Sequence, residues 1–139
     1  MHKSVRGIIK KNDGIVLIHR IKPRQDGTNR EYYVVPGGKM EVGETEQETV
    51  IREIYEELGI EIKPKKRVIE YNSNYDDSIQ IFYTCEYVKG NIGTGNGPEM
   101  TNKNEYAGIF EPVIVKISEI KNLNVVPTEI KEYLEKEVM

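Results

Sequence analysis

Residues 38–60 read GKMEVGETEQETVIREIYEELGI and carry a strong local excess of acid in the 139-residue chain. Seven glutamates and two basic residues give this stretch a net charge of −5, whereas the whole chain has a net charge of −3. The rest of the chain is therefore slightly basic. An acidic segment inside a basic chain indicates a local function for its carboxylates.

The second half of this stretch is predicted to form an α-helix. Thr45 and Glu48 form the S/T-x-x-E pattern of a capping box, so the helix should begin near Thr45. Gly59 is placed to end it. At about 100° per residue, five apolar side chains share one broad face: Val50, Ile51, Ile54, Tyr55 and Leu58.

Glu53, Glu56 and Glu57 lie together on another face of this helix. Like charges at these spacings repel by a few tenths of a kcal/mol per pair, so their clustering favours a bound cation. Mg²⁺ prefers oxygen ligands and commonly bridges carboxylates to substrate phosphates. The alternative, which is the general expectation for a charge run, is an acidic face that only contacts water.

The stretch resembles the Nudix box, G-x5-E-x7-R-E-U-x-E-E-x-G-U, in which U is apolar. Every specified position is matched, by Gly38, Glu44, Arg52, Glu53, Ile54, Glu56, Glu57, Gly59 and Ile60. The resemblance to the Nudix hydrolase family implies an α/β (α+β) protein with the Nudix fold, in which a mixed β-sheet lies between helices in an α/β/α sandwich. It covers most of the chain, so residues 1–139 are expected to form a single Nudix hydrolase domain.

The order of the expected elements agrees with this fold. Strands are predicted at 4–10, 14–20, 31–35, 67–71, 79–88 and 113–117, a helical turn at 118–123 and a second helix at 128–138. The first two strands are joined by an Asn-Asp-Gly turn signal. Residues 21–30 are predicted to be a polar loop, and residues 89–108 a functional or mobile loop.

By this resemblance, the chain would use water to hydrolyse a pyrophosphate bond in a nucleoside diphosphate linked to another group. Mg²⁺, with Mn²⁺ as an alternative, would be bound by Glu53, Glu56 and Glu57, and by the backbone carbonyl of Gly37. Arg52 would orient a glutamate through a salt bridge, and Glu44 would brace the loop. The substrate range stays open among nucleoside triphosphates, oxidised dNTPs, ADP-ribose-like molecules and dinucleoside polyphosphates.

The general base has three candidates. Some family members use the position of Glu53, which is the first choice here as both ligand and base. Others use a glutamate from the loop after the long strand, where Glu99 is the second choice and Glu105 a further candidate. The alternative for either loop glutamate is a side chain that only faces solvent.

The substrate is expected to contact basic and aromatic residues around the glycine loop. Residues 1–39 contain nine Lys or Arg against three acids, and cations that precede a metal helix suit a polyphosphate. The candidate substrate-binding residues are Arg6, Arg20, Tyr33, Gly38, Lys39 and Phe110. Tyr32 and Tyr33 both precede the loop, and one could stack on a base. MutT-type hydrolases carry an asparagine at the place assigned to Phe110, which offers stacking without hydrogen bonds.

A nucleotide-sensing module on the same fold is the alternative function, although a sensor has no need for three metal-binding glutamates. A calcium-binding surface is a third, without an EF-hand pattern to support it. The net charge argues against a nucleic-acid polymer as partner, and a homodimer is suggested only by analogy with relatives. The chain has no membrane-spanning apolar run and no signal-peptide core, so a cytoplasmic protein is expected. Cys85 is expected to be a buried thiol.

Overall fold

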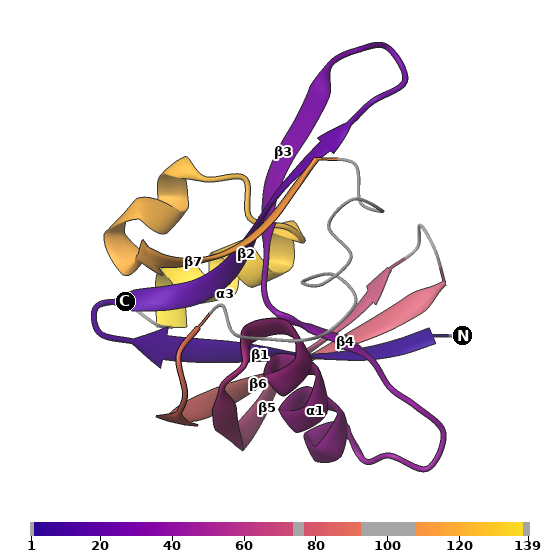
Figure 1. Cartoon of the computed structure of the whole chain (residues 1–139), viewed down its shortest axis with the longest axis vertical. Helices are drawn as coiled ribbons and strands as arrows, with labels where there is room; N and C mark the ends of the chain where they lie inside the picture. The colour runs from indigo at the N-terminus through magenta and orange to yellow at the C-terminus, as the bar shows by residue number, and fades with distance from the viewer. Residues whose placement is uncertain (1, 74–76, 93–107, 138–139) are drawn as a thin grey trace.

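The structure, a computed structural model, describes residues 2–73, 77–92 and 108–137. Its elements are β1 (His2–Lys11), β2 (Gly14–Pro23), β3 (Asn29–Val34), β4 (Gly37–Lys39), α1 (Glu46–Leu58), β5 (Glu61–Ser73), β6 (Ser78–Lys89), β7 (Ile109–Lys116), the 3₁₀ helix η2 (Ile117–Asn122) and α3 (Thr128–Glu137) (Figure 1). The strands form one seven-stranded sheet in the order β3-β2-β1-β6-β5, with β4 paired to β1 and β7 to β2. Only β1 and β6 pair in parallel among these strands, so the sheet is mixed, as predicted.

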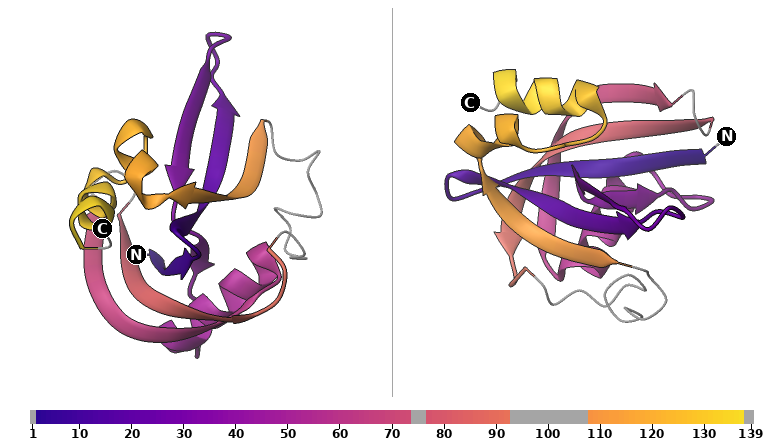
Figure 2. Two further views of the ribbon diagram at one scale, coloured as in Figure 1. Left: turned by 90° about the vertical axis from the view of Figure 1, so that its left-hand side faces the viewer. Right: turned by 90° about the horizontal axis from the view of Figure 1, so that it is seen from above.

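Two cores lie on opposite faces of this sheet because side chains alternate along each strand. Val5 and Ile9 of β1 face the core that α1 covers, whereas Ile8 faces the core that η2 and α3 cover. Ile130 and Leu134 of α3 are fully buried in the second core, as expected. This is the layered arrangement of helices and sheet that the sequence predicts (Figure 2).

Helix α1 begins and ends where the sequence predicts. Thr45 is the N-cap and forms a complete capping box with Glu48, and Gly59 is the C-cap with φ 76°. The predicted apolar face is too wide, however. Ile51 and Tyr55 are 42% and 52% exposed, because the sheet contacts only the narrow stripe Val50, Ile54 and Leu58, and Glu57 is buried on the other side of that stripe.

The predicted loop at residues 21–30 is wrong, because β2 and β3 continue through most of it as a two-stranded arm. Their ladder extends to the pair Pro23 and Asn29, and the turn is closed by a hydrogen bond from the Arg24 amide to the Thr28 carbonyl. The arm projects from the body of the protein (Figures 1 and 2). It is polar and exposed, so the apolar alternation that reveals a half-buried strand is missing.

Strand β5 is also longer than predicted, since it begins at Glu61 and passes through Pro64. Proline is tolerated there because β5 is an edge strand, and the register shifts between Pro64 and Lys66. Cys85 is buried as expected, and burial raises its pKa to about 12. Among the described residues, no helix combines the length and apolar character needed to cross a membrane.

The corrected face of α1 can be tested with two isoleucines three residues apart. Ile54→Ala should lower the free energy of unfolding by about 2–5 kcal/mol, because a fully buried side chain leaves a cavity. Ile51→Ala should change it by less than about 1 kcal/mol. Urea unfolding followed by circular dichroism measures both, and equal losses would contradict the described orientation of the helix.

Candidate active site

Arg52 connects the acidic residues of the helix to the loop that precedes it. Its Nε and Nη2 atoms donate to the two carboxylate oxygens of Glu44 at 2.7 and 3.0 Å. Nη1 donates to Glu53 at 2.9 Å and to Glu56 at 3.1 Å, and Nη2 also donates to the Lys39 carbonyl at 3.0 Å. The hydrogen bonds to Glu44 are the main cause of a raised Arg52 pKa. The guanidinium thereby holds three carboxylates that would otherwise repel one another.

Glu44 fixes the loop to the helix, which is the position predicted for a bracing residue. Besides Arg52, it accepts hydrogen bonds from the Glu41 amide at 2.9 Å and from the Thr49 hydroxyl at 3.0 Å. The Arg52 hydrogen bond, followed by that of the Glu41 amide, lowers the Glu44 pKa to about 2. This carboxylate is therefore ionised throughout the neutral range.

Gly37 and Gly38 bring the backbone of β4 close to its neighbours. Gly37 has φ 149°, and a Cβ there would lie 2.3 Å from the Val5 carbonyl oxygen. A Cβ on Gly38 would lie 2.3 Å from a carboxylate oxygen of Glu53. Since no side chain fits either place, the glycines allow the Glu53 carboxylate to pack directly on the loop backbone.

Buried Glu57 and partly buried Arg6 bring opposite charges together beside the glycine loop. Glu57 is only 6% exposed, and its carboxylate accepts a hydrogen bond from the Gly37 amide at 3.2 Å. Arg6 donates to the Val35 carbonyl at 2.8 Å and to Gln80 at 3.0 Å. Burial lowers the Arg6 pKa, and the charges of Glu57 and Glu53 oppose that shift. Arg6 is thus a desolvated cation held beside two of the box carboxylates.

A cavity of about 370 Å³ opens beside these groups. Five of the six predicted substrate-binding residues line it, together with Gly37 and Glu57; these five are Arg6, Arg20, Gly38, Lys39 and Phe110. Tyr33 is the exception, since it lies on the opposite face of β3 and stacks on His19 at a centroid distance of 4.7 Å. Tyr32 lines the cavity in its place.

Arg20 enters this cavity with an unsatisfied donor. Its guanidinium lies over the Phe110 ring at 5.0 Å, and its Nε atom is buried without a hydrogen-bond partner among the described residues. A buried donor without a partner costs free energy. The expected partner is a group that binds in the cavity, such as a phosphate oxygen.

Sequence reasoning considered Tyr32 but chose Tyr33 as the candidate, and it missed Gln80. Two adjacent tyrosines leave open which of them faces the cavity. Side chains two residues apart share a face of a strand, so the apolar Val34, which packs against the core beside α1, was the signal that favoured Tyr32. Gln80 interrupts an apolar run in β6, where a polar side chain indicates a buried partner. Glu99 and Glu105, the two loop candidates for the general base, lie outside the described residues.

The oxygen atoms of these glutamates and of the glycine loop can be compared with the ligands that a divalent metal prefers. In the described parts of the chain, no three Asp, Glu, His or Cys side chains are grouped so that they could hold an ion together. Glu53 and Glu56 do converge on one nitrogen of Arg52, and Glu57 borders the cavity. These donors are all oxygen atoms, which suit a hard cation. The metal-binding set therefore fits by donor type and stays a prediction.

The mixed sheet, the glycine loop and the helix with its Arg52-bound glutamates define the Nudix class of domain. The family profile described as the NUDIX domain matches residues 1–132, so this chain belongs to that family. It is 34% identical over 97 residues to an ADP-ribose pyrophosphatase of Methanocaldococcus jannaschii, and the alignment covers 67% of this chain and 55% of that protein. It is 31% identical over 84 residues to the NAD-capped RNA hydrolase NudC of Salmonella schwarzengrund, covering 60% of this chain and 31% of NudC.

The chain thus spans about half or less of the length of these curated relatives. Solved structures show the same fold at lower identity. A MutT structure from work on Aliivibrio salmonicida and Vibrio cholerae superposes with a TM-score of 0.71 at 20% identity, over 98% of this chain and 97% of that one. A NUDIX hydrolase from Nitrosomonas europaea gives 0.71 at 18% identity, over 99% and 72%.

The ion pair of Glu44 with Arg52 predicts a specific dependence of stability on pH. A carboxylate whose folded pKa of about 2 lies below its usual 4.5 stabilises the fold above pH 4.5, and this contribution disappears as the pH falls toward 2. Glu44→Gln should therefore lower Tm at pH 7, and the difference from the unmodified chain should shrink steadily below pH 4.5. Thermal melts between pH 7 and pH 2.5 measure this.

Glu41→Gln is the control, because Glu41 is exposed and lies 3.6 Å from Arg52. Its effect on Tm should be small at every pH. A Glu44→Gln deficit that stayed constant down to pH 2.5 would contradict the assigned ion pair.

Proposed function

We propose that this protein is a divalent metal-dependent pyrophosphohydrolase, which uses water to split a pyrophosphate bond in a nucleoside diphosphate derivative. The observation that carries the proposal is one cavity in which Glu57 and the glycine loop meet the cations Arg6, Arg20 and Lys39. A purely acidic pocket would repel a diphosphate, and a purely basic one would have no place for a metal. The combination suits a metal-bound polyphosphate.

The cations would bind and orient the diphosphate. Arg6 is held in place by Val35 and Gln80, so little conformational entropy remains to be lost when a phosphate binds. Arg20 has the unpartnered Nε donor described above, and arginine presents its donors in a planar fork that matches phosphate oxygens. Phe110 and Tyr32 provide aromatic surface for a nucleobase in the same cavity.

The acidic residues would hold the metal and handle the proton. Mg²⁺ or Mn²⁺ would be bound by Glu53, Glu56 and Glu57 and by the carbonyl of Gly37. The ion would neutralise charge on the diphosphate and lower the pKa of a bound water. Arg52 keeps Glu53 and Glu56 oriented from one nitrogen. The proposed base is Glu53, whose carboxylate packs against Gly38, a residue that lines the cavity. Glu53 would take the proton from the attacking water. Glu99 or Glu105 is the alternative base.

ADP-ribose is the first substrate to test, because the relative that shares 34% identity is named for its hydrolysis. Nucleoside triphosphates, oxidised dNTPs and dinucleoside polyphosphates complete the panel. A nucleotide sensor without turnover remains the second candidate function. The three glutamates that Arg52 holds, together with Glu57 at the cavity, favour the enzyme, because a sensor has no need for carboxylates arranged at this cost in repulsion.

Removal of a single ligand charge tests the catalytic assignment. Glu57→Gln should lower kcat/KM by roughly 100-fold while the chain stays folded, since glutamine can still accept from the Gly37 amide. Glu48→Gln is the matched control on the same helix, because glutamine also satisfies a capping box, and its kcat/KM should stay close to that of the unmodified chain. Full activity of Glu57→Gln would refute the assignment.

Metal dependence is tested by chelation. Treatment with EDTA should abolish phosphate or nucleotide release, and added Mg²⁺ or Mn²⁺ should restore it, because the carboxylates alone cannot neutralise a diphosphate. Chromatographic product analysis measures the reaction. Undiminished turnover in excess EDTA would exclude the proposed chemistry.

A further inference from the structure

The arm formed by β2 and β3 has two faces of different chemistry. The register pairs Ile18 with Val34, Arg20 with Tyr32, and Lys22 with Arg30, so these residues share one face. His19, Ile21, Glu31 and Tyr33 occupy the other. The face with Ile18 and Val34 is the one that lines the candidate active site. The Lys and Arg residues of the paired strands, Arg20, Lys22 and Arg30, therefore all lie on the face of the cavity, whereas Glu31 lies on the opposite face.

These side chains form successive rows that lead out of the cavity. The first row is apolar, with Ile18 and Val34. The second row contains Tyr32, Arg20 and Phe110, which lie side by side across three strands. The third row contains the cations Lys22 and Arg30, one step of the strand further out. Each step of two residues advances about 6.6 Å along a strand, which is comparable with the separation of successive phosphates in an extended nucleotide chain.

The outer cations, Lys22 and Arg30, have no carboxylate partner among the described residues. Lys22 and Arg30 lie directly opposite each other, and like charges in that position destabilise a strand pair. Both are exposed, and neither makes an ion pair with a described residue. A cost of this kind is removed when an anion binds between the two side chains. The arrangement thus suits a ligand with negative charge beyond the cavity.

Aromatic rings alternate with these cations. Arg30 lies over the Tyr32 ring at 4.3 Å, and Arg20 lies over the Phe110 ring at 5.0 Å. Stacked guanidinium groups and aromatic rings are the surfaces on which unpaired bases stack. A second cavity of about 450 Å³ adjoins the first at Tyr32 and is also lined by Arg30. The base of the arm thus borders two cavities, and the aromatic rings and cations lie beside them.

We infer that this face of the arm binds a single-stranded nucleotide chain whose 5′-terminal diphosphate occupies the candidate active site. The inference rests on the proposed function, because that function places the diphosphate in the cavity. An inorganic polyphosphate or an acidic peptide would use the cations and leave the aromatic rows without a role. The net charge of the whole chain opposes general nucleic-acid binding, so the contact is confined to the arm.

The test measures binding without turnover. The probe is hexaadenylate with a 5′-diphosphate and a 3′-fluorescein, followed by fluorescence anisotropy in EDTA, with ADP as competitor. The hexanucleotide should bind at least about tenfold more tightly than ADP, since each stacked base contributes about 1–3 kcal/mol. Lys22→Glu should weaken hexanucleotide binding about tenfold. The slope of the logarithm of the binding constant against the logarithm of the salt concentration should become shallower by about 0.7. The affinity of this variant for ADP should not change.

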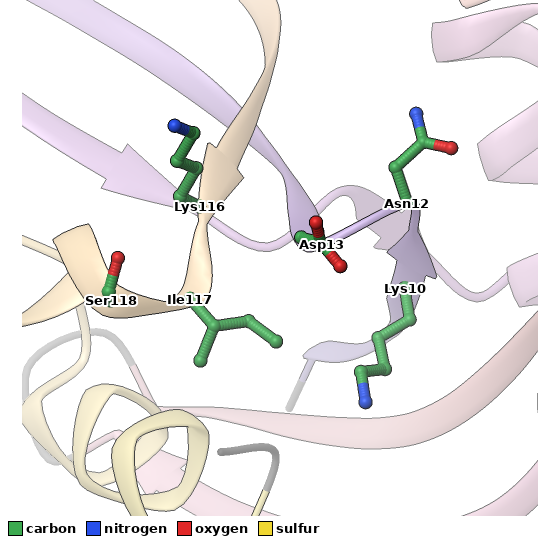
Figure 3. Close-up of a pocket in the computed structure, with 6 residues that line it drawn as sticks. All are labelled: Lys10, Asn12, Asp13, Lys116, Ile117 and Ser118. Carbon is green, nitrogen blue, oxygen red and sulfur yellow. The ribbon is translucent and has the colours of Figure 1, made fainter.

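Lys116→Glu provides a matched control at the other end of β2. Lys116 pairs with Gly14 and borders a separate cavity that Lys10 and Asp13 also line (Figure 3). The substitution makes the same change in net charge on an exposed strand residue. It should alter hexanucleotide binding less than about twofold if the arm alone makes the contact.

Three results would overturn the inference: equal affinity for hexanucleotide and ADP, equal effects of the two lysine variants, or equally strong competition by inorganic polyphosphate of matched charge. Turnover of ADP-ribose with Mg²⁺ is measured separately. Hydrolysis by a chain that binds the hexanucleotide no better than ADP would leave the proposed function intact and refute the arm. Tight, Lys22-dependent binding by a chain that, with Mg²⁺, hydrolyses neither the panel nor the hexanucleotide 5′-diphosphate would support the arm and refute the enzyme.

Discussion

The ion pair between Arg52 and Glu44 is the interaction on which the rest of the site depends. It ties the loop before α1 to the helix itself, and the same guanidinium holds Glu53 and Glu56. Glutamates at these spacings repel one another on an isolated helix. Arginine can compensate them together because its planar group offers five donors in fixed directions, whereas lysine offers one compact charge. A lysine at this position would therefore leave at least one carboxylate without a neutralising hydrogen bond.

The glycine loop carries this arrangement to the cavity wall. Gly38 permits the Glu53 carboxylate to lie against the backbone, and the Gly37 amide donates to Glu57. Glu57 is buried beside Arg6, and its burial sets the rotation of α1 on the sheet. The exposure of Ile51 and Tyr55 follows from that rotation. On this helix a buried carboxylate therefore takes the place that an apolar side chain could have filled.

The sequence predicts the features of this protein that depend on local interactions. The ends of α1 follow from Thr45, Glu48 and Gly59, because caps involve residues within one turn of each other. The β2–β3 arm is not predictable in this way, since its strands are polar and its pairing is visible only in three dimensions. The choice of Tyr33 over Tyr32 was wrong by one residue, because a single step along a strand changes the face. Most of the cavity was predictable from the box and its basic neighbours, whereas its outward extension was not.

Strand β2 shows how one element can serve both the core and the site. Near Gly14 both faces of the strand are buried, and Ile15, Val16, Leu17 and Ile18 fill the two cores. From His19 outward the two faces diverge, with Arg20 and Lys22 on the side of the cavity and the His19–Glu31 contact on the other. Because the strand is continuous, the position of Arg20 is fixed by the same backbone ladder that holds the core. A cation that is placed at the cavity in this way needs no separate scaffold, and the arm beyond it can vary in charge without disturbing the core that supports it.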